Sequence, residues 1–165
     1  IMAIEYGDGS DSNTGRIIQV KTGYKSSRAS TTSTSFTSTG LSESITPTDN
    51  NNKILVLCNI RLGFASGNLG YAALYRDSTK IFQGDSYGSA QRCTFSADGS
   101  SGQHDAFVPT IIYLDEPGTT SSITYDIRYR GHNGNTVRVN CVGSDRSNGT
   151  DGVFASSLVL MEVAE

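Results

Sequence analysis

The chain has 165 residues, a formal net charge of −3 and 36% hydrophobic residues. A chain of this length forms one domain that buries roughly 70% of its unfolded surface. Nucleic-acid affinity depends on Lys and Arg that neutralise phosphates, and an acidic chain without a basic run excludes that function. No stretch reaches the ~18 consecutive apolar residues of a membrane-spanning helix, so we expect no membrane insertion.

Residues 1–15 are predicted to form a polar N-terminal arm, and residues 16–165 the folded domain. The arm is rich in Gly, Asp and Ser, and Ile4 and Tyr6 are its notable apolar residues. A segment of this composition adds little to a hydrophobic core.

Alternating apolar and polar residues predict β-strands through the rest of the chain, because successive side chains of a strand point to opposite faces. Residues 122–130 show the clearest case, with Ile123, Tyr125, Ile127 and Tyr129 at every second position. In chain order, the predicted strands are 16–24, 41–46, 53–64, 71–77, 80–83, 90–95, 107–115, 122–130, 136–142 and 153–163.

Turn signals separate these segments. The residues DST between 71–77 and 80–83 predict a hairpin. Asn133-Gly134 predicts a second hairpin between 122–130 and 136–142, because a type I′ turn requires positive φ at both central residues. About ten short strands at regular spacing predict an all-β fold, a single jelly-roll β-sandwich of antiparallel strands.

Two of the predicted strands, around 108–114 and 153–163, are apolar on both faces. A sandwich core covers only one face of each strand, so the other face needs a partner or a covering segment. The alternative to a subunit contact is that residues 1–50 fold over this face within the monomer. We assign four residues to a subunit interface: Ile111, Tyr113, Leu158 and Leu160.

Cys58, Cys93 and Cys141 make an odd count without CxxC spacing. Each falls on the apolar phase of its predicted strand, where a free Cys behaves as a small buried hydrophobe. We therefore expect three reduced, buried thiols in a protein made in a reducing cytoplasm.

Gly84-Asp85-Ser86-Tyr87-Gly88 matches the GxSxG pattern of serine hydrolases. That nucleophile elbow requires a helix after the serine, whereas the residues that follow are predicted to form a strand. His104 and His132 are the histidines that could serve as base. We interpret the pattern as a Ser/Gly loop and predict no catalytic residue and no enzymatic activity.

Acidic loops at 7–13 and around Asp145 and Asp151 offer oxygen ligands, but they lack the spacing of an EF-hand. Solvated loops are the preferred interpretation, a surface Ca²⁺ site is the alternative, and we predict no cofactor and no metal site. Among eight tyrosines, Tyr87 lies in a predicted loop and is the best platform for a sugar ring.

Several segments, in order, resemble small phage virion proteins and tail-fibre head domains: GRIIQV, TSFTSTGLSESITPT, NKILVL, LYRDSTKIF, YLDEPGTTSSITYDIRYR and SLVLMEV. The resemblance extends over most of residues 15–163, and its most specific part is LDEPGTTSSITYDI with the closing strand that ends in ME. It implies a jelly-roll domain that trimerises, similar to the heads of tumour necrosis factor and C1q.

The resemblance further implies a non-enzymatic bacteriophage virion structural protein, made in the host cytoplasm and located in the virion. A trimeric capsid decoration (cement) or knob protein is the first expectation. Its partners would be two further copies of itself and another virion protein, such as the major capsid or tail protein, with Ile4 and Tyr6 as attachment residues. The alternative is a receptor- or glycan-binding head of a tail fibre or tail tip, with Tyr87 in contact with a host surface glycan.

Overall fold

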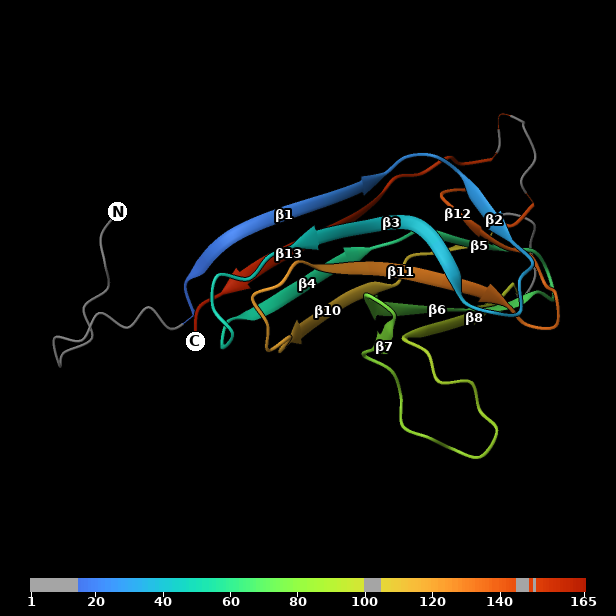
Figure 1. Ribbon diagram of the computed structural model, residues 1–165. Coiled ribbons are helices and arrows are strands. Elements are labelled where there is room, and N and C mark those ends of the chain that lie inside the picture. Colours follow the sequence, from blue (N-terminus) through green and yellow to red (C-terminus); the bar gives the residue numbers. More distant parts are fainter. Residues whose placement is uncertain (1–14, 100–104, 145–148, 150) are drawn as a thin grey trace, which may run out of the picture.

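The computed structural model describes residues 15–99, 105–144, 149 and 151–165. These residues form thirteen β-strands in three antiparallel sheets and contain no helix (Figure 1). The prediction of an all-β sandwich is confirmed.

The strands fall into two large sheets and one small one. The first sheet has the order β1 (Ile17–Lys25), β13 (Ser156–Val163), β4 (Lys53–Asn59), β10 (Thr110–Asp115). The second sheet has the order β3 (Thr37–Ile45), β11 (Ile123–Gly131), β6 (Leu69–Arg76), β7 (Thr79–Ile81), and β8 (Phe95–Asp98) also pairs with β6. The third sheet has the order β2 (Ala29–Thr31), β12 (Val137–Val139), β5 (Leu62–Phe64), β9 (Ala106–Phe107).

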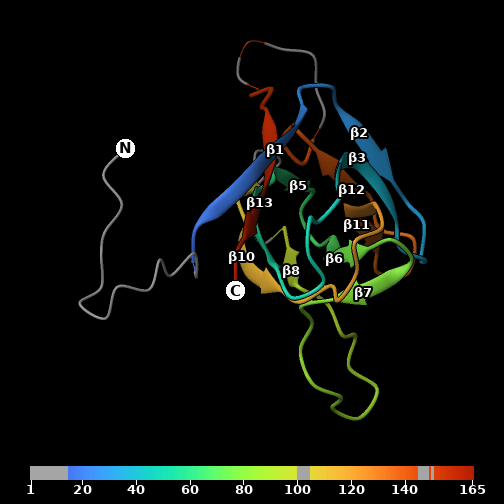
Figure 2. The ribbon, with the colours of Figure 1, turned by 60° about the vertical axis from the view of Figure 1, so that its left-hand side comes forward.

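The connectivity of the two large sheets is that of a jelly roll. In chain order their main strands are β1, β3, β4, β6, β7, β10, β11 and β13. The first sheet contains the first, eighth, third and sixth of these, and the second sheet contains the second, seventh, fourth and fifth. Such interleaving arises when a long antiparallel pair of strands wraps around a sandwich, and Figure 2 shows the two sheets on opposite sides of it.

The core lies between the inner faces of these sheets. Val56 on β4 is paired with Leu160 on β13, and both are fully buried, as are Tyr125 and Ile127 on β11. Each fully buried side chain of this size contributes about 1.5–3 kcal/mol relative to an exposed one. The alternation seen in residues 122–130 thus places its apolar phase in the core, as the periodicity predicts.

A buried polar cluster connects the two sheets. The Tyr125 hydroxyl on β11 donates to Asp115 Oδ2 on β10 over 2.6 Å, and Arg76 Nη1 on β6 donates to the same oxygen over 2.8 Å. Burial, together with the Asp115 carboxylate, raises the pKa of Tyr125. The neutral phenol therefore stays a donor to Asp115.

A second buried carboxylate joins the first strand of the fold to the last. Glu162, fully buried on β13, accepts hydrogen bonds from Gln19 Nε2 (2.6 Å), Asn52 Nδ2 (2.7 Å) and both the backbone N–H and the hydroxyl of Thr48 (2.7 and 2.8 Å). Burial raises the pKa of this carboxyl, but the four hydrogen bonds outweigh burial and hold its pKa below the ordinary value. The glutamate of the closing ME dipeptide is thus a structural anchor.

Several predicted elements differ from the structure. The predicted strand 107–115 is broken at residues 108–109, so that β9 and β10 belong to different sheets. The predicted strand 53–64 is broken at residues 60–61, so that β4 and β5 belong to different sheets. The predicted strand 90–95 is wrong, because these residues form a loop until β8 begins at Phe95.

A further difference concerns the Asn133-Gly134 turn, where φ is 48° and 84°, as a type I′ turn requires. The strands on either side do not form the predicted hairpin, since β12 pairs with β2 and β5. The predicted hairpin of β6 and β7, in contrast, is confirmed.

Candidate functional site

The outward surface of the first sheet is apolar across all four strands. One row across the sheet runs from Val20 through Met161 and Leu55 to Leu114, and the next runs from Thr22 through Val159 and Leu57 to Ile112. We call the apolar members of these rows the outer apolar face: Val20, Leu55, Leu57, Ile112, Leu114, Val159 and Met161.

This face is open in the monomer. Ile112 is 64% exposed, Val20 49% and Leu114 47%, and these three lie on the edge strands β10 and β1. The apolar residues of this face on the central strands β4 and β13 are half-buried. Polar groups border the face at both ends. Tyr24, Ser157, Asn59 and Thr110 form the next row at one end, and at the other end Lys53 forms ion pairs of 3.1 and 3.3 Å with Glu116 and Glu165.

The side chains predicted to form the subunit interface lie on the opposite face. Leu158 and Leu160 are fully buried and Ile111 is 3% exposed, so all three belong to the core of the monomer. A side chain without exposed surface cannot contact a second subunit, and the residue assignment is corrected on this ground. The sequence shows that β13 is apolar on both faces, but the alternation does not identify the face that turns inward.

Tyr113, the fourth residue of that assignment, is half-buried at the edge of the sandwich. Its ring stacks on Phe82 with 4.9 Å between the ring centroids and an interplanar angle of 26°. Tyr113 therefore connects β10 to the start of the loop that follows β7.

Residues 15–50 do not cover the outer apolar face as the alternative interpretation requires. Within this range β1 is the edge strand of the first sheet itself, and β2 and β3 belong to the other two sheets. Residues 1–14, which include Ile4 and Tyr6, lie outside the described residues.

The outward surface of the second sheet is charged and aromatic. Arg128 lies 4.2 Å from the ring centroid of Tyr75, and its Nε donates to Asp126 over 2.8 Å. The Arg130 guanidinium lies 5.3 Å from the ring centroid of Tyr71, and the Lys80 ammonium lies 4.5 Å from that of Phe36. Long cationic side chains thus cover the aromatic rings of this face.

The loop of residues 82–94, between β7 and β8, projects away from the sandwich (Figures 1 and 2). Tyr87 in this loop is 84% exposed. The base of the loop is fixed: Arg92 Nε donates to the Gly84 carbonyl over 2.7 Å, and Lys80 Nζ to the Arg92 carbonyl over 2.8 Å.

The GxSxG pattern lies in this same loop. Ser86 is exposed, and the next element after it is strand β8 rather than a helix. The local structure of a nucleophile elbow is therefore missing. His104, one of the two candidate bases, lies outside the described residues, while His132 is hydrogen-bonded to the Tyr71 hydroxyl at 3.3 Å.

The three cysteines are free thiols in two different environments. Cys58 and Cys141 are buried, and burial raises the pKa of Cys58 to about 12. Cys93 is only half-buried, at the base of the 82–94 loop, so the prediction that all three are core residues is wrong for Cys93.

Asp145 and the acidic loop at 7–13 lie outside the described residues. The described part of the chain contains no group of three or more His, Cys, Asp or Glu side chains that could hold a metal ion. Across the same residues, no helix has the length and apolar character needed to cross a membrane.

The chain matches no protein-family model and no curated protein. Among solved structures it is similar to the infectious bursal disease virus Gx strain (TM-score 0.44, 14% identity, 92% of this chain covered and 38% of that chain). It is also similar to the VP2 subviral particle of infectious bursal disease virus (TM-score 0.45, 11% identity, 90% and 38%). The chain thus spans about two fifths of the length of these viral chains.

Proposed function

We propose that this protein is a non-enzymatic bacteriophage virion structural protein that assembles as a homotrimer and decorates a capsid as a cement or knob protein. The observation that carries the proposal is the outer apolar face of the first sheet. Its seven apolar residues occupy all four strands, so the face is continuous rather than a scatter of single exposed side chains.

The layout of this face suits a protein contact. Interfaces between subunits have an apolar centre and a polar rim, and here polar residues border the apolar rows at both ends. Soluble monomers rarely leave such a patch in water. A second copy of the chain is the natural partner, because identical copies commonly associate through closed symmetry.

The sequence resemblance supports three copies rather than two. In a trimer, the first sheet of each subunit would face the three-fold axis and the second sheet would face outward. The charged surface of the second sheet is compatible with that outward position.

Attachment to the particle is proposed to involve the N-terminal arm through Ile4 and Tyr6. The arm joins the domain beside the end of the last strand. Gly15 N–H donates to the Ala164 carbonyl over 2.7 Å, and Ala164 N–H donates to the Arg16 carbonyl over 2.9 Å. Both ends of the domain are thus at one end of the first sheet, and the proposal places the contact with the particle at that end.

The test is the mass in solution, measured by light scattering. We expect about three times 17.6 kDa for the natural chain and the monomer mass for Ile112→Asp, which places a charge on the most exposed apolar residue of the outer apolar face, on the edge strand β10. Val153→Asp is the matched control, because Val153 is equally exposed (63%) but lies outside the two large sheets. A natural chain that stays monomeric at micromolar concentration would contradict the proposal.

A second candidate function is a receptor- or glycan-binding head of a tail fibre or tail tip. The projecting loop with Tyr87 favours it, since a fixed base and an exposed ring at 84% are features of a binding loop. Tyr87→Ala should abolish binding to host cells, whereas Tyr24→Ala, which removes a ring of similar exposure (71%) from β1, should not. Equal binding by both variants would remove this candidate.

A further inference from the structure

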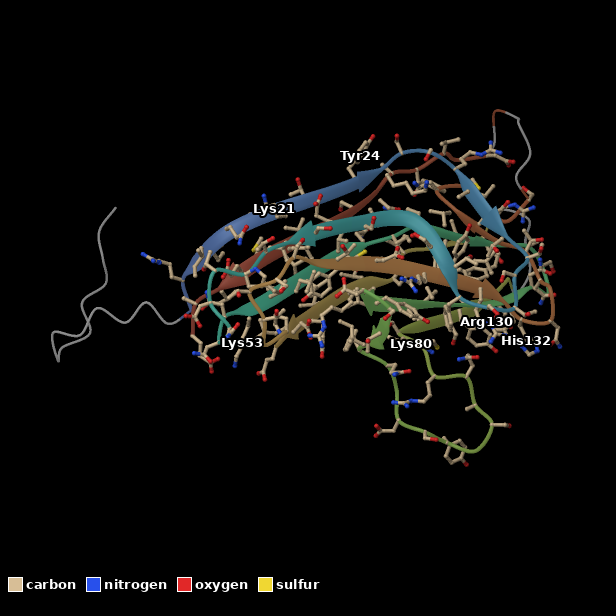
Figure 3. The ribbon with its side chains drawn as sticks, in the orientation of Figure 1. Lys21, Tyr24, Lys53, Lys80, Arg130 and His132 are labelled. Carbon is tan, nitrogen blue, oxygen red and sulfur yellow. The ribbon has the colours of Figure 1, made fainter. Side chains whose placement is uncertain are left out.

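Three cationic side chains meet where the 82–94 loop returns to the second sheet. Lys80 on β7 lies opposite Tyr75, and Arg130 on β11 lies opposite Tyr71. Lys80 Nζ donates to the Arg92 carbonyl over 2.8 Å, and Arg130 Nη1 donates to Gln91 Oε1 over 2.6 Å. The two strand cations therefore contact two adjacent loop residues, Arg130 the side chain of Gln91 and Lys80 the backbone of Arg92 (Figure 3 labels Lys80 and Arg130).

These three cations lack an acidic partner among the described residues. Their hydrogen bonds go to neutral oxygens: backbone carbonyls for Lys80 and Arg92, and a carbonyl and an amide for Arg130. Arg128, two residues before Arg130 on the same strand, has the Asp126 carboxylate instead. An ammonium has three N–H donors and a guanidinium five, so most donors of the cluster remain free for an anion.

The electrostatics agree with this geometry. Burial lowers the pKa of Lys80, Cys93 counteracts this, and the Arg92 and Arg130 charges lower it further. Like charges that are held together without a counter-ion oppose each other, and a bound anion would relieve this repulsion.

The neighbouring groups suit a saccharide. The Tyr71 ring lies under Arg130, and its hydroxyl contacts His132 at 3.3 Å. Tyr87 projects from the same loop with 84% of its surface exposed. The exposed ring of Tyr87 offers a flat surface to the C–H groups of a sugar, and tyrosine hydroxyls and glutamine amides can bond its hydroxyls.

The size of the cluster argues against a nucleic acid. Strong phosphate-backbone binding uses many cations along an extended surface, whereas this cluster has three, and Asp85, Asp98 and Asp126 lie in or beside the same loop and strands. A compact ligand with one or two negative charges fits this bounded arrangement.

We infer that the base of the 82–94 loop and the outward surface of β6, β7 and β11 form a binding site for an acidic saccharide, whose carboxylate or sulfate is held by Lys80, Arg92 and Arg130. This inference deepens the glycan-binding candidate and is independent of the trimer. In this site the three cations select for a negatively charged sugar, and Tyr87 contacts a sugar ring.

The experiment measures binding of sialyllactose, and of lactose as its neutral counterpart, to the full chain by isothermal titration calorimetry at low and at high salt. We expect sialyllactose to bind at least tenfold more tightly than lactose, with an affinity that falls at high salt. The double variant Lys80→Gln/Arg130→Gln should lose at least tenfold in sialyllactose affinity. Lys21→Gln, which removes an exposed cation of the edge strand β1 (Figure 3), should bind as the natural chain does.

Three outcomes would overturn the inference: equal binding of the two sugars, no binding of sialyllactose at millimolar concentration, or tighter binding of an acidic peptide than of sialyllactose. A Tyr87-dependent binding of lactose without preference for sialyllactose would leave the glycan-binding candidate standing and remove only the acidic site. Circular dichroism of the double variant separates a loss of binding from a loss of fold, and Arg92→Gln alone, in the exposed loop, provides a second variant with less effect on the sheet.

Discussion

The two large sheets have the same alternation but opposite outward chemistry. On the second sheet, Ala73 lies in the middle of β6 opposite Arg128 and is fully buried, although it points outward. On the first sheet, Leu57 of β4 lies opposite Ile112, which is 64% exposed. The second sheet thus covers its own surface with long polar side chains. The two apolar rows of the first sheet contain no long polar side chain that could cover them in the same way.

This difference indicates which surface needs a partner. A cationic stem folded over an aromatic ring hides apolar area and keeps its charge in water, so the second sheet is compatible with a free surface. An aliphatic side chain has no charged end that could stay in water while its apolar part is covered. The first sheet is the surface where we expect assembly, and the second sheet is the surface where we expect small, charged ligands.

The largest expected effect is a difference in the free energy of unfolding between variants on the inner and the outer face of the first sheet. Leu160→Ala removes a fully buried side chain and should lower the free energy of unfolding by about 3 kcal/mol. Ile112→Ala removes an exposed side chain and should change the free energy of the isolated monomer by less than about 0.5 kcal/mol. Urea denaturation at a concentration where the natural chain is monomeric measures both values, and similar losses for the two variants would break the distinction between the inner and the outer face.

The next largest effect concerns Glu162, which anchors the edge of the first sheet. Glu162 accepts four hydrogen bonds, and Glu162→Gln replaces one of its oxygens by an NH₂ group that faces other donors. We expect the free energy of unfolding to fall by about 2 kcal/mol. The matched control is Glu165→Gln, since Glu165 is exposed at the end of the same chain segment.

The same residue predicts a pH dependence. The folded pKa of Glu162 lies below the ordinary 4.5, so its contribution is fully present above pH 4.5 and is lost as the pH falls through the folded pKa. The natural chain should therefore lose more stability than Glu162→Gln when the pH is lowered from 6 to 3, as measured by thermal unfolding. Parallel losses in the two proteins would contradict the proposed role of the carboxylate.

The sequence predicts the jelly roll because alternation is a local property. Residues 122–130 alternate regularly and contain most of β11, and the Leu and Val residues of the closing segment form β13 within the predicted range. The break of the predicted strand 53–64 is not local. It occurs where the Arg61 N–H bonds to the Ser156 hydroxyl, on a strand that is distant in the sequence.

The candidate site was predictable only to the level of strands. Apolar residues on both faces of β13 and β10 indicate that one apolar face of these strands is exposed. Whether Leu160 or Met161 points into the core, however, depends on how β13 pairs with β1 and β4. The cluster of Lys80, Arg92 and Arg130 gave no local signal at all. Its members come from two strands and a loop, and only the pairing of β6 with both β7 and β11 brings them together.

A smaller effect tests the self-covered surface of the second sheet. Arg128→Lys keeps the charge but loses the planar contact with Tyr75 and the forked donation to Asp126 and the Asp77 carbonyl. We expect a loss of about 1 kcal/mol, which corresponds to roughly 2–4 °C in Tm for a chain of this size. Lys25→Arg on β1 is the control, and an unchanged Tm for Arg128→Lys would show that the stacked geometry does not stabilise this surface.

The smallest effect leaves stability unchanged and reports on the three thiols. Cys58 and Cys141 are 3% exposed, whereas Cys93 is half-buried beside the cationic cluster. Burial raises the pKa of Cys93, and the Lys80 charge lowers it in part. The thiolate is the reactive form of cysteine. About one thiol per native chain should therefore react with Ellman's reagent, at a rate that increases with pH. Cys93→Ser should abolish this reaction, and denaturation should expose two further thiols in each protein, for totals of two in the variant and three in the natural chain. Rapid reaction of any thiol in the native Cys93→Ser variant would mean that the protein interior opens readily, which would contradict the contrast between a closed inner face and an open outer one.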